Sequence, residues 1–149
     1  MQMQKIEIQK HSHLDERTIQ FGMLCMWVCE QLPKDYAGKN IADQLFRSST
    51  SVAANYAESS EPESDADFIH RIKIAMKELK ESRVWLRFAR EMLKDPYIDD
   101  VVDETVEIQR MMGASLKKRG YKGWSSKHDK TALSKPKPNT EYWILNTEN

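Results

Sequence analysis

Residues 48–60 read SSTSVAANYAESS, and nine of these thirteen side chains are Ser, Thr or Ala. Serine and threonine each weaken a helix by a few tenths of a kcal/mol relative to alanine. The surrounding sequence nevertheless keeps the spacing of one helix face, which steps through Ala42, Leu45, Ser49, Val52 and Tyr56. Contacts with other helices must offset the weak propensity, and the small side chains of Ser49, Ala53 and Ala57 would let a neighbouring helix approach closely.

Three further stretches show the same spacing of three and four residues, and Pro and Gly separate the four stretches from one another. The predicted helices cover about residues 15–32, 40–58, 64–95 and 99–119. Their expected N-caps include Asp15 for the first helix and Ser64, in a capping box with Asp67, for the third. The core-facing stripes predicted for the first, third and fourth helices are Leu14, Arg17, Phe21, Leu24, Val28 and Leu32; Phe68, Ile72, Ala75, Leu79, Ser82, Leu86, Ala89 and Leu93; and Val101, Thr105, Ile108, Met112 and Ser115.

Short connections between four amphipathic helices favour one way of burying all four apolar stripes, which is an antiparallel up-and-down four-helix bundle. The sequence therefore predicts an all-α fold with the bundle over residues 14–120. Residues 1–13 are predicted to form an N-terminal extension, and residues 121–149 a flexible basic C-terminal tail.

The overall charge is balanced, with 23 basic and 23 acidic side chains, so the whole molecule has no net field that would draw it to nucleic acid or to an anionic membrane. Cys25 and Cys29 lie four residues apart in an apolar run and are expected to be core residues, because a disulfide within one helical turn is geometrically poor. No apolar run approaches the roughly 20 residues of a membrane span, and no secretory leader is evident. We therefore expect a reduced, soluble, cytoplasmic protein with no membrane partner.

The basic residues are unevenly distributed along the chain. Residues 117–149 contain eight Lys or Arg and three acidic residues, whereas residues 1–116 contain 15 and 20. Basic side chains interleaved with aromatic rings suit the phosphates and unstacked bases of nucleic acid. The candidate nucleic-acid-binding residues are Lys117, Lys118, Arg119, Lys122, Trp124, Lys127 and Lys130. The alternative interpretation is a solvated tail that its lysines keep soluble.

Two stretches carry a resemblance to a known family: RSSTSVAANYAE at residues 47–58 and DFIHRIKIAMKELKESRVWL at residues 67–86. They resemble the signature of a bacterial family of four-helix-bundle proteins, named for members encoded by intervening sequences inside large-subunit ribosomal RNA genes. The resemblance extends over roughly residues 14–116. The residues that match the family motif, and that we expect at packing or subunit contacts, are Arg47, Ser48, Ser49, Ser51, Ala53, Asn55, Ala57 and Glu58.

The resemblance implies a bundle that self-assembles, with a homopentamer as the expected form, and that has no established catalytic activity or cofactor. The same superfamily includes proteins similar to the accessory variability determinant of diversity-generating retroelements. That relative forms a pentameric barrel and associates with a reverse transcriptase and with nucleic acid. The resemblance therefore implies a reverse transcriptase as a candidate protein partner and nucleic acid as a second one, although that relative is strongly basic and this chain is neutral.

No catalytic or metal site is predicted. His11 and His13 lack a third ligand at a characteristic spacing, and the serine run lacks a nearby histidine base. The favoured function is a non-enzymatic, homo-oligomeric scaffold or accessory protein that contacts RNA or DNA through its basic C-terminal segment. Two alternatives stay open: a protein-binding adaptor of the antitoxin kind, and a small-molecule-binding or enzymatic bundle with a cleft along a polar stripe of the second helix, formed by Gln44, Ser48, Ser51, Asn55 and Glu58.

Overall fold

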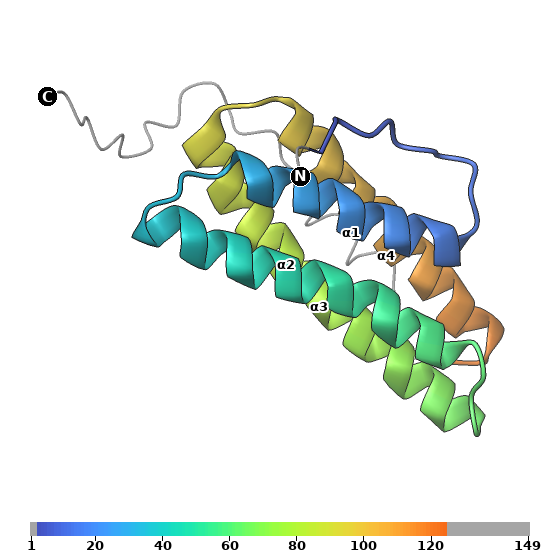
Figure 1. Ribbon diagram of the computed structural model, residues 1–149. Coiled ribbons are helices and arrows are strands. Elements are labelled where there is room, and N and C mark those ends of the chain that lie inside the picture. Colours follow the sequence, from blue (N-terminus) through green and yellow to red (C-terminus); the bar gives the residue numbers. More distant parts are fainter. Residues whose placement is uncertain (1–2, 125–149) are drawn as a thin grey trace, which may run out of the picture.

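Four helices follow one another in the computed structural model, which describes residues 3–124: α1 (Leu14–Gln31), α2 (Tyr36–Ser59), α3 (Asp65–Leu93) and α4 (Tyr97–Lys118). Figure 1 shows them as an up-and-down bundle, and no strand occurs within residues 3–124. The predicted all-α four-helix bundle is therefore confirmed. The predicted flexible tail lies, from residue 125 onward, outside the described residues.

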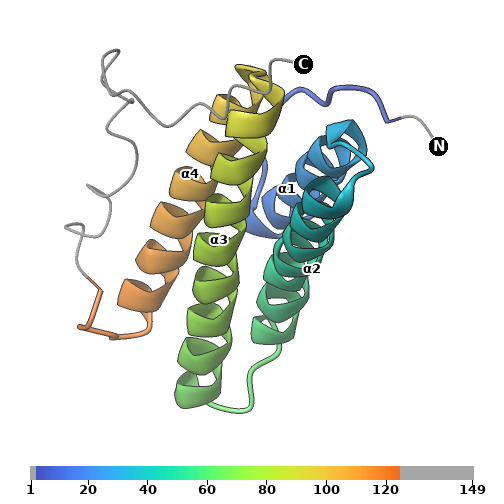
Figure 2. The same ribbon diagram turned by 90° about the vertical axis from the view of Figure 1, so that its left-hand side faces the viewer.

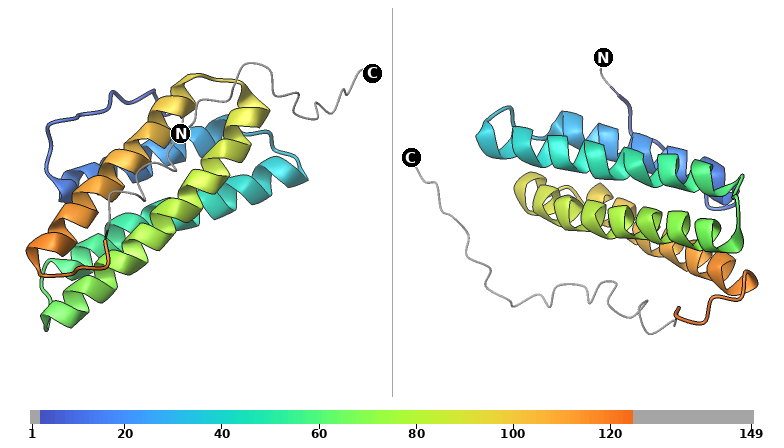
Figure 3. Two further views of the ribbon diagram at one scale, coloured as in Figure 1. Left: turned by 180° about the vertical axis from the view of Figure 1, so that it is seen from behind. Right: turned by 90° about the horizontal axis from the view of Figure 1, so that it is seen from below.

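Each helix runs antiparallel to the one before it in the chain (Figures 1 and 2). Between α2 and α3, for example, residues further along one helix contact residues further back on the other. Ser48 faces Ser82 and Glu58 faces Arg71 between α2 and α3, while Arg17 faces Glu104 between α1 and α4. The pair α2 and α3 has the most extensive packing, and α1 and α3 lie at diagonal corners of the bundle (Figure 2). Figure 3 shows the same arrangement from behind and from below.

The predicted core stripes are largely confirmed. All six stripe positions of α1 are buried, as are the seven from Phe68 to Ala89 on α3, and only the last, Leu93, is half-buried. On α4 the stripe is buried up to Met112, and Ser115 is half-buried. Leu45, Ser49 and Val52 of α2 complete the core with no exposed surface.

The helix boundaries differ from the prediction at three points. The N-cap position of α1 is His13, which makes no side-chain capping hydrogen bond, so the expectation of Asp15 was wrong. At α3 the Ser64 cap is confirmed, because the Asp67 N–H donates to Ser64 Oγ at 3.0 Å, but the Asp67 carboxylate accepts at 3.3 Å from the N–H of Glu63, the residue before the cap, rather than from that of Ser64 as in a capping box. Helix α4 starts at Tyr97, two residues earlier than expected, because Pro96 has the backbone conformation of a helix start.

Helix α2 begins four residues before the predicted Asn40, because Asp35 caps it and Gly38 is part of its first turn. The Gly38 N–H donates to Asp35 Oδ1 at 2.8 Å. A Cβ at Gly38 would lie 2.0 Å from the carbonyl oxygen of Pro33, which is rigid backbone. Glycine at this position therefore permits the tight turn between α1 and α2, although in the sequence it reads as a helix breaker.

Replacing Gly38 by alanine is expected to lower the free energy of unfolding by about 1–3 kcal/mol, the usual cost of forcing extra volume into a packed site. Urea unfolding followed by circular dichroism measures the change. The matched control is Gly22→Ala on α1, where the nearest atom to a new Cβ is 3.9 Å away and no destabilising clash arises. Equal stability of the Gly38 variant and the native protein would contradict the tight turn.

The N-terminal segment, residues 3–13, runs back along the bundle rather than away from it (Figure 1). The backbone N–H of Met3 donates to Glu30 Oε2 at 2.8 Å, and the Tyr97 hydroxyl donates to the Ile6 carbonyl at 2.7 Å. Lys5 pairs with Asp95 at 3.3 Å and lies over the ring of Tyr97. The predicted extension therefore ties α1 to the start of α4.

Candidate functional site

The small residues of α2 are used first for packing inside the chain. Ser49 is fully buried, and a Cβ added to Gly22 of α1 would lie 3.9 Å from the Ser49 carbonyl oxygen, so the two backbones approach closely at this point. Ala53 is half-buried, whereas Ala57 is exposed. The predicted close approach is therefore confirmed at Ser49, but it does not bury Ala57, which is exposed.

The polar stripe of α2 does not form one surface. Ser48 has no exposed area and lies against α3, where the Ser82 hydroxyl donates to Ser48 Oγ at 2.9 Å. The Asn55 side-chain amide donates to the Ser51 carbonyl at 2.9 Å, which is a bond within the helix. Glu58 pairs with Arg71 of α3 at 2.5 Å. Ser48 and Glu58 therefore link α2 to α3, as expected of packing residues, and the stripe does not line one open cleft.

Arg47, the first residue of the family motif, also links these two helices. Its guanidinium pairs with Glu78 at 3.3 Å and with Glu81, both on α3. The hydrogen bond with Arg47 holds the pKa of Glu81 below its ordinary value. The side chain of Arg47 is half exposed, so this pair contributes little to stability and mainly sets the register of α2 against α3.

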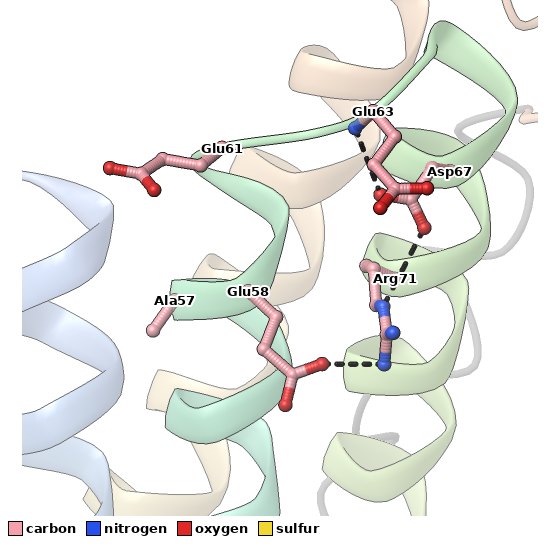
Figure 4. A pocket seen from close by; sticks show the side chains of 6 residues that line it. All are labelled: Ala57, Glu58, Glu61, Glu63, Asp67 and Arg71. Carbon is pink, nitrogen blue, oxygen red and sulfur yellow. Dashed lines mark hydrogen bonds and ion pairs between the residues drawn. The ribbon is translucent and has the colours of Figure 1, made fainter.

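One open hollow lies at the α2–α3 connection, and Figure 4 shows its lining. Five of its six lining residues are charged, and four of those carry carboxylates: Ala57, Glu58, Glu61, Glu63, Asp67 and Arg71. Arg71 Nε also approaches Asp67 Oδ1, at 3.7 Å. Of the predicted polar stripe, Glu58 is the member that lines this hollow, and it is already ion-paired. The hollow is therefore not the cleft along the polar stripe of α2 that a small-molecule-binding function would require.

The cysteines carry no reactive thiolate. Both are free, Cys25 is buried and Cys29 is half-buried, where its thiol donates to the Ala42 carbonyl at 3.3 Å. Burial raises the pKa of Cys25 well above its ordinary value and that of Cys29 to about 11. Both thiols are therefore protonated at neutral pH, as expected of core side chains.

A buried ion pair, which sequence reasoning missed as a pair, crosses from α1 to α4. Arg17 Nε donates to Glu104 Oε1 at 2.8 Å, and Nη2 donates to Oε2 at 2.7 Å. Both side chains are almost inaccessible to solvent, and the hydrogen bond with Glu104 raises the pKa of Arg17. Arg17 stands on the predicted apolar stripe, which signals a buried charge, but nothing in the sequence identifies its partner 87 residues away.

Arg83 of α3 is half-buried without a carboxylate partner among residues 3–124. Its Nε donates to Thr105 Oγ1 and its Nη2 donates to Gln109 Oε1, each at 2.7 Å, and both acceptors are neutral side chains of α4. Burial lowers the pKa of Arg83 from its ordinary value, and the group remains a cation. The seam between α3 and α4 therefore holds a fixed positive charge whose hydrogen-bond acceptors are neutral.

The predicted nucleic-acid-binding residues do not gather on one open surface. Lys117, Lys118 and Lys122 are exposed, but Arg119 pairs with Asp65 at 2.9 Å and its guanidinium lies 4.4 Å from the centre of the Phe68 ring. Trp124 packs against the backbone of Gly113, where a Cβ would meet its ring at 2.1 Å. Lys127 and Lys130 lie outside the described residues.

Among residues 3–124 there is no group of three or more His, Cys, Asp or Glu side chains placed to hold a metal ion. In the same part of the chain no helix is both long and apolar enough to cross a membrane.

The fold and these contacts define a four-helix bundle whose polar clusters are structural links between helices. The model of the 23S rRNA-intervening sequence protein family matches residues 11–114, which is most of the chain, and the protein belongs to this family. A crystal structure of a protein of unknown function from the S23 ribosomal protein family of Bacteroides thetaiotaomicron is similar in fold. It superposes with a TM-score of 0.65 at 23% identity, over 70% of this chain and 99% of that one. Comparison with curated proteins gave no match.

Proposed function

We propose that the protein is a non-enzymatic scaffold that assembles into a closed homo-oligomeric ring and binds nucleic acid. Two separate exposed apolar surfaces carry the self-association. The first lies on the outer sides of α1 and α2 and comprises Ile19, Met23 and Phe46, which are 56%, 42% and 49% exposed. The second lies along α3 and comprises Val84, Phe88 and Met92, which follow one another at intervals of four residues.

The positions of these surfaces favour a ring over a symmetric dimer. Helices α1 and α3 occupy diagonal corners of the bundle, so their outer sides point away from each other (Figure 2). A ring forms when one surface of a subunit binds a different surface of the next subunit and the rotation closes. The first surface of one copy is proposed to pack on the second surface of the next, and five is the number of copies implied by the family resemblance.

The contact with nucleic acid is the second part of the proposal. The family is named for an association of its members with 23S ribosomal RNA genes, and Lys117, Lys118 and Lys122 supply exposed positive charge at one end of the bundle. A ring would add the fields of several such ends, so that weak sites act together. A protein partner such as a reverse transcriptase stays a prediction from the resemblance.

Light scattering coupled to size-exclusion chromatography tests the assembly. The expected result is a mass about five times the 17.4 kDa of one chain, unchanged on moderate dilution. A monomer at every concentration would refute the scaffold proposal, whatever the protein binds.

A further inference from the structure

Helix α3 carries a row of five cations, of which one contacts α4 and four are exposed to solvent. They are Lys73, Lys77, Lys80, Arg83 and Arg87, and we name them the α3 basic stripe. Their spacing of three and four residues places them on one side of a helix that turns by about 100° per residue. Arg83 is the half-buried member that contacts α4. The row spans 14 residues, which is about 21 Å along the helix axis.

None of the five cations pairs with a carboxylate within residues 3–124. The acidic residues of α3 are engaged elsewhere, because Glu78 and Glu81 bind Arg47 of α2, and Glu91 binds Lys94. Lys73 lies over the ring of Tyr121, a contact that keeps its charge. The stripe is therefore a positive surface on a protein whose total charge is zero.

Where Arg83 meets α4, both of its hydrogen-bond acceptors are neutral, and the acidic side chains of α4 stand on either side of this contact: Asp99 pairs with Arg90, Glu107 pairs with Arg110, and Asp103 is exposed. The two acceptors, Thr105 and Gln109, are buried. Arg83 is held by Thr105 and Gln109 in a fixed orientation, so less side-chain freedom is lost when it meets an anion.

We infer that the α3 basic stripe binds the phosphate backbone of a single strand of nucleic acid. One strand carries a phosphate about every 3.4 Å along a duplex axis, so a row of about 21 Å faces several phosphates in succession. Lysine is depleted in the centres of protein–protein interfaces, which argues against an acidic protein as the occupant. The inference rests on the nucleic-acid part of the proposed function and deepens it, because it adds α3 as the main contact beside the exposed lysines at the C-terminal end of the bundle.

The stripe and the second apolar surface share part of one helix face, because Val84 follows Lys80 by four residues and precedes Arg87 by three, whereas Lys73 and Lys77 lie seven or more residues before the apolar surface along the axis. By the helical period, the directions of Lys80 and Arg87 lie roughly 90° from the centre of the apolar surface. A subunit seated on the apolar surface therefore leaves Lys80 and Arg87 at the rim of the contact.

Three variants with equal changes in net charge test the inference on the full chain. The stripe variant is Lys77→Gln, Lys80→Gln and Arg87→Gln, and the remote control is Lys10→Gln, Lys34→Gln and Lys39→Gln, all at exposed positions. The third variant is Lys117→Gln, Lys118→Gln and Lys122→Gln. Fluorescence anisotropy of a labelled oligouridine RNA, between about 50 and 200 mM salt, gives the affinity and its salt dependence.

The stripe variant is expected to bind RNA at least about tenfold more weakly than the native protein at low salt. The slope of log K against log salt concentration should become shallower by about two, because three cations are lost and each single-strand phosphate contact contributes about 0.7. The remote control is expected to bind like the native protein. Loss of binding in the C-terminal variant alone would overturn the inference and place the contact at residues 117–122. Polyglutamate that competes as well as RNA of equal charge would overturn the assignment to nucleic acid.

Light scattering on the same three variants separates this inference from the scaffold proposal. All three are expected to keep the mass of the native protein, because the glutamines replace side chains outside both apolar surfaces. Absence of RNA binding by the native oligomer at low salt would overturn the stripe and the nucleic-acid proposal together while leaving the scaffold intact.

Discussion

Replacing Glu104 by glutamine is expected to lower the free energy of unfolding by about 3–5 kcal/mol, the cost found for removing one partner of a buried ion pair. Glutamine keeps the shape of the side chain, but it removes the carboxylate to which Arg17 donates two hydrogen bonds. The guanidinium then stays buried without its bonded counter-charge. Domains of this size are stable by about 5–15 kcal/mol, so the variant should lose a large part of its stability.

Urea unfolding followed by far-ultraviolet circular dichroism measures this change. The matched control is Glu107→Gln on the same helix, where the partner is Arg110 and the pair is exposed, so the expected change is within about 0.5 kcal/mol. A second control, Arg17→Met with Glu104→Leu, removes both charges and is expected to come close to the native stability. A loss below about 1 kcal/mol for Glu104→Gln would contradict the burial of this pair.

The second large effect is expected on assembly. Changing Met23 and Phe46 to glutamate places two charges on the first apolar surface, and changing Phe88 and Met92 to glutamate does the same on the second. Each double variant should fold, because the altered side chains are at least a third exposed, and each should fall to the mass of one chain. The matched control is Lys77→Glu on α3, outside both surfaces, which should keep the oligomeric mass.

The sequence was sufficient for the fold because the apolar stripes keep one period over long distances. On α1 and on most of α3, each position that the spacing assigned to the core is buried. The errors lie at the ends of helices. Gly38 looked like a break in α2, but a capping bond from its own N–H to Asp35 brings it into the first turn.

The contacts between distant segments were beyond the reach of the sequence. Ser48 and Ser82 are each ordinary polar residues of a helix, and only the packing of α2 on α3 makes them partners in the core. Arg17 and Glu104 form their pair for a similar reason. Which two side chains meet across a helix pair depends on how each helix is rotated about its axis, and the local sequence pattern does not determine that rotation.

The sequence analysis did not single out the α3 basic stripe, because charge was counted along the chain rather than around each helix. The count assigned the basic surface to residues 117–149, and much of that segment lies outside the described residues. On α3 the acidic residues bind α2 or the helix end, which leaves the α3 basic stripe uncompensated. A helical projection of residues 73–87 would have shown this separation from the sequence alone.

The most direct test of the proposed ring mixes the two double variants of the apolar surfaces. Each variant has lost one surface and kept the other, so in a head-to-tail contact the intact surface of one can still bind the intact surface of the other. Light scattering of an equal mixture is expected to give a mass about twice the 17.4 kDa of one chain, while each variant alone gives the single-chain mass. A mixture that stays at the single-chain mass would contradict the pairing of two different surfaces on which the scaffold depends.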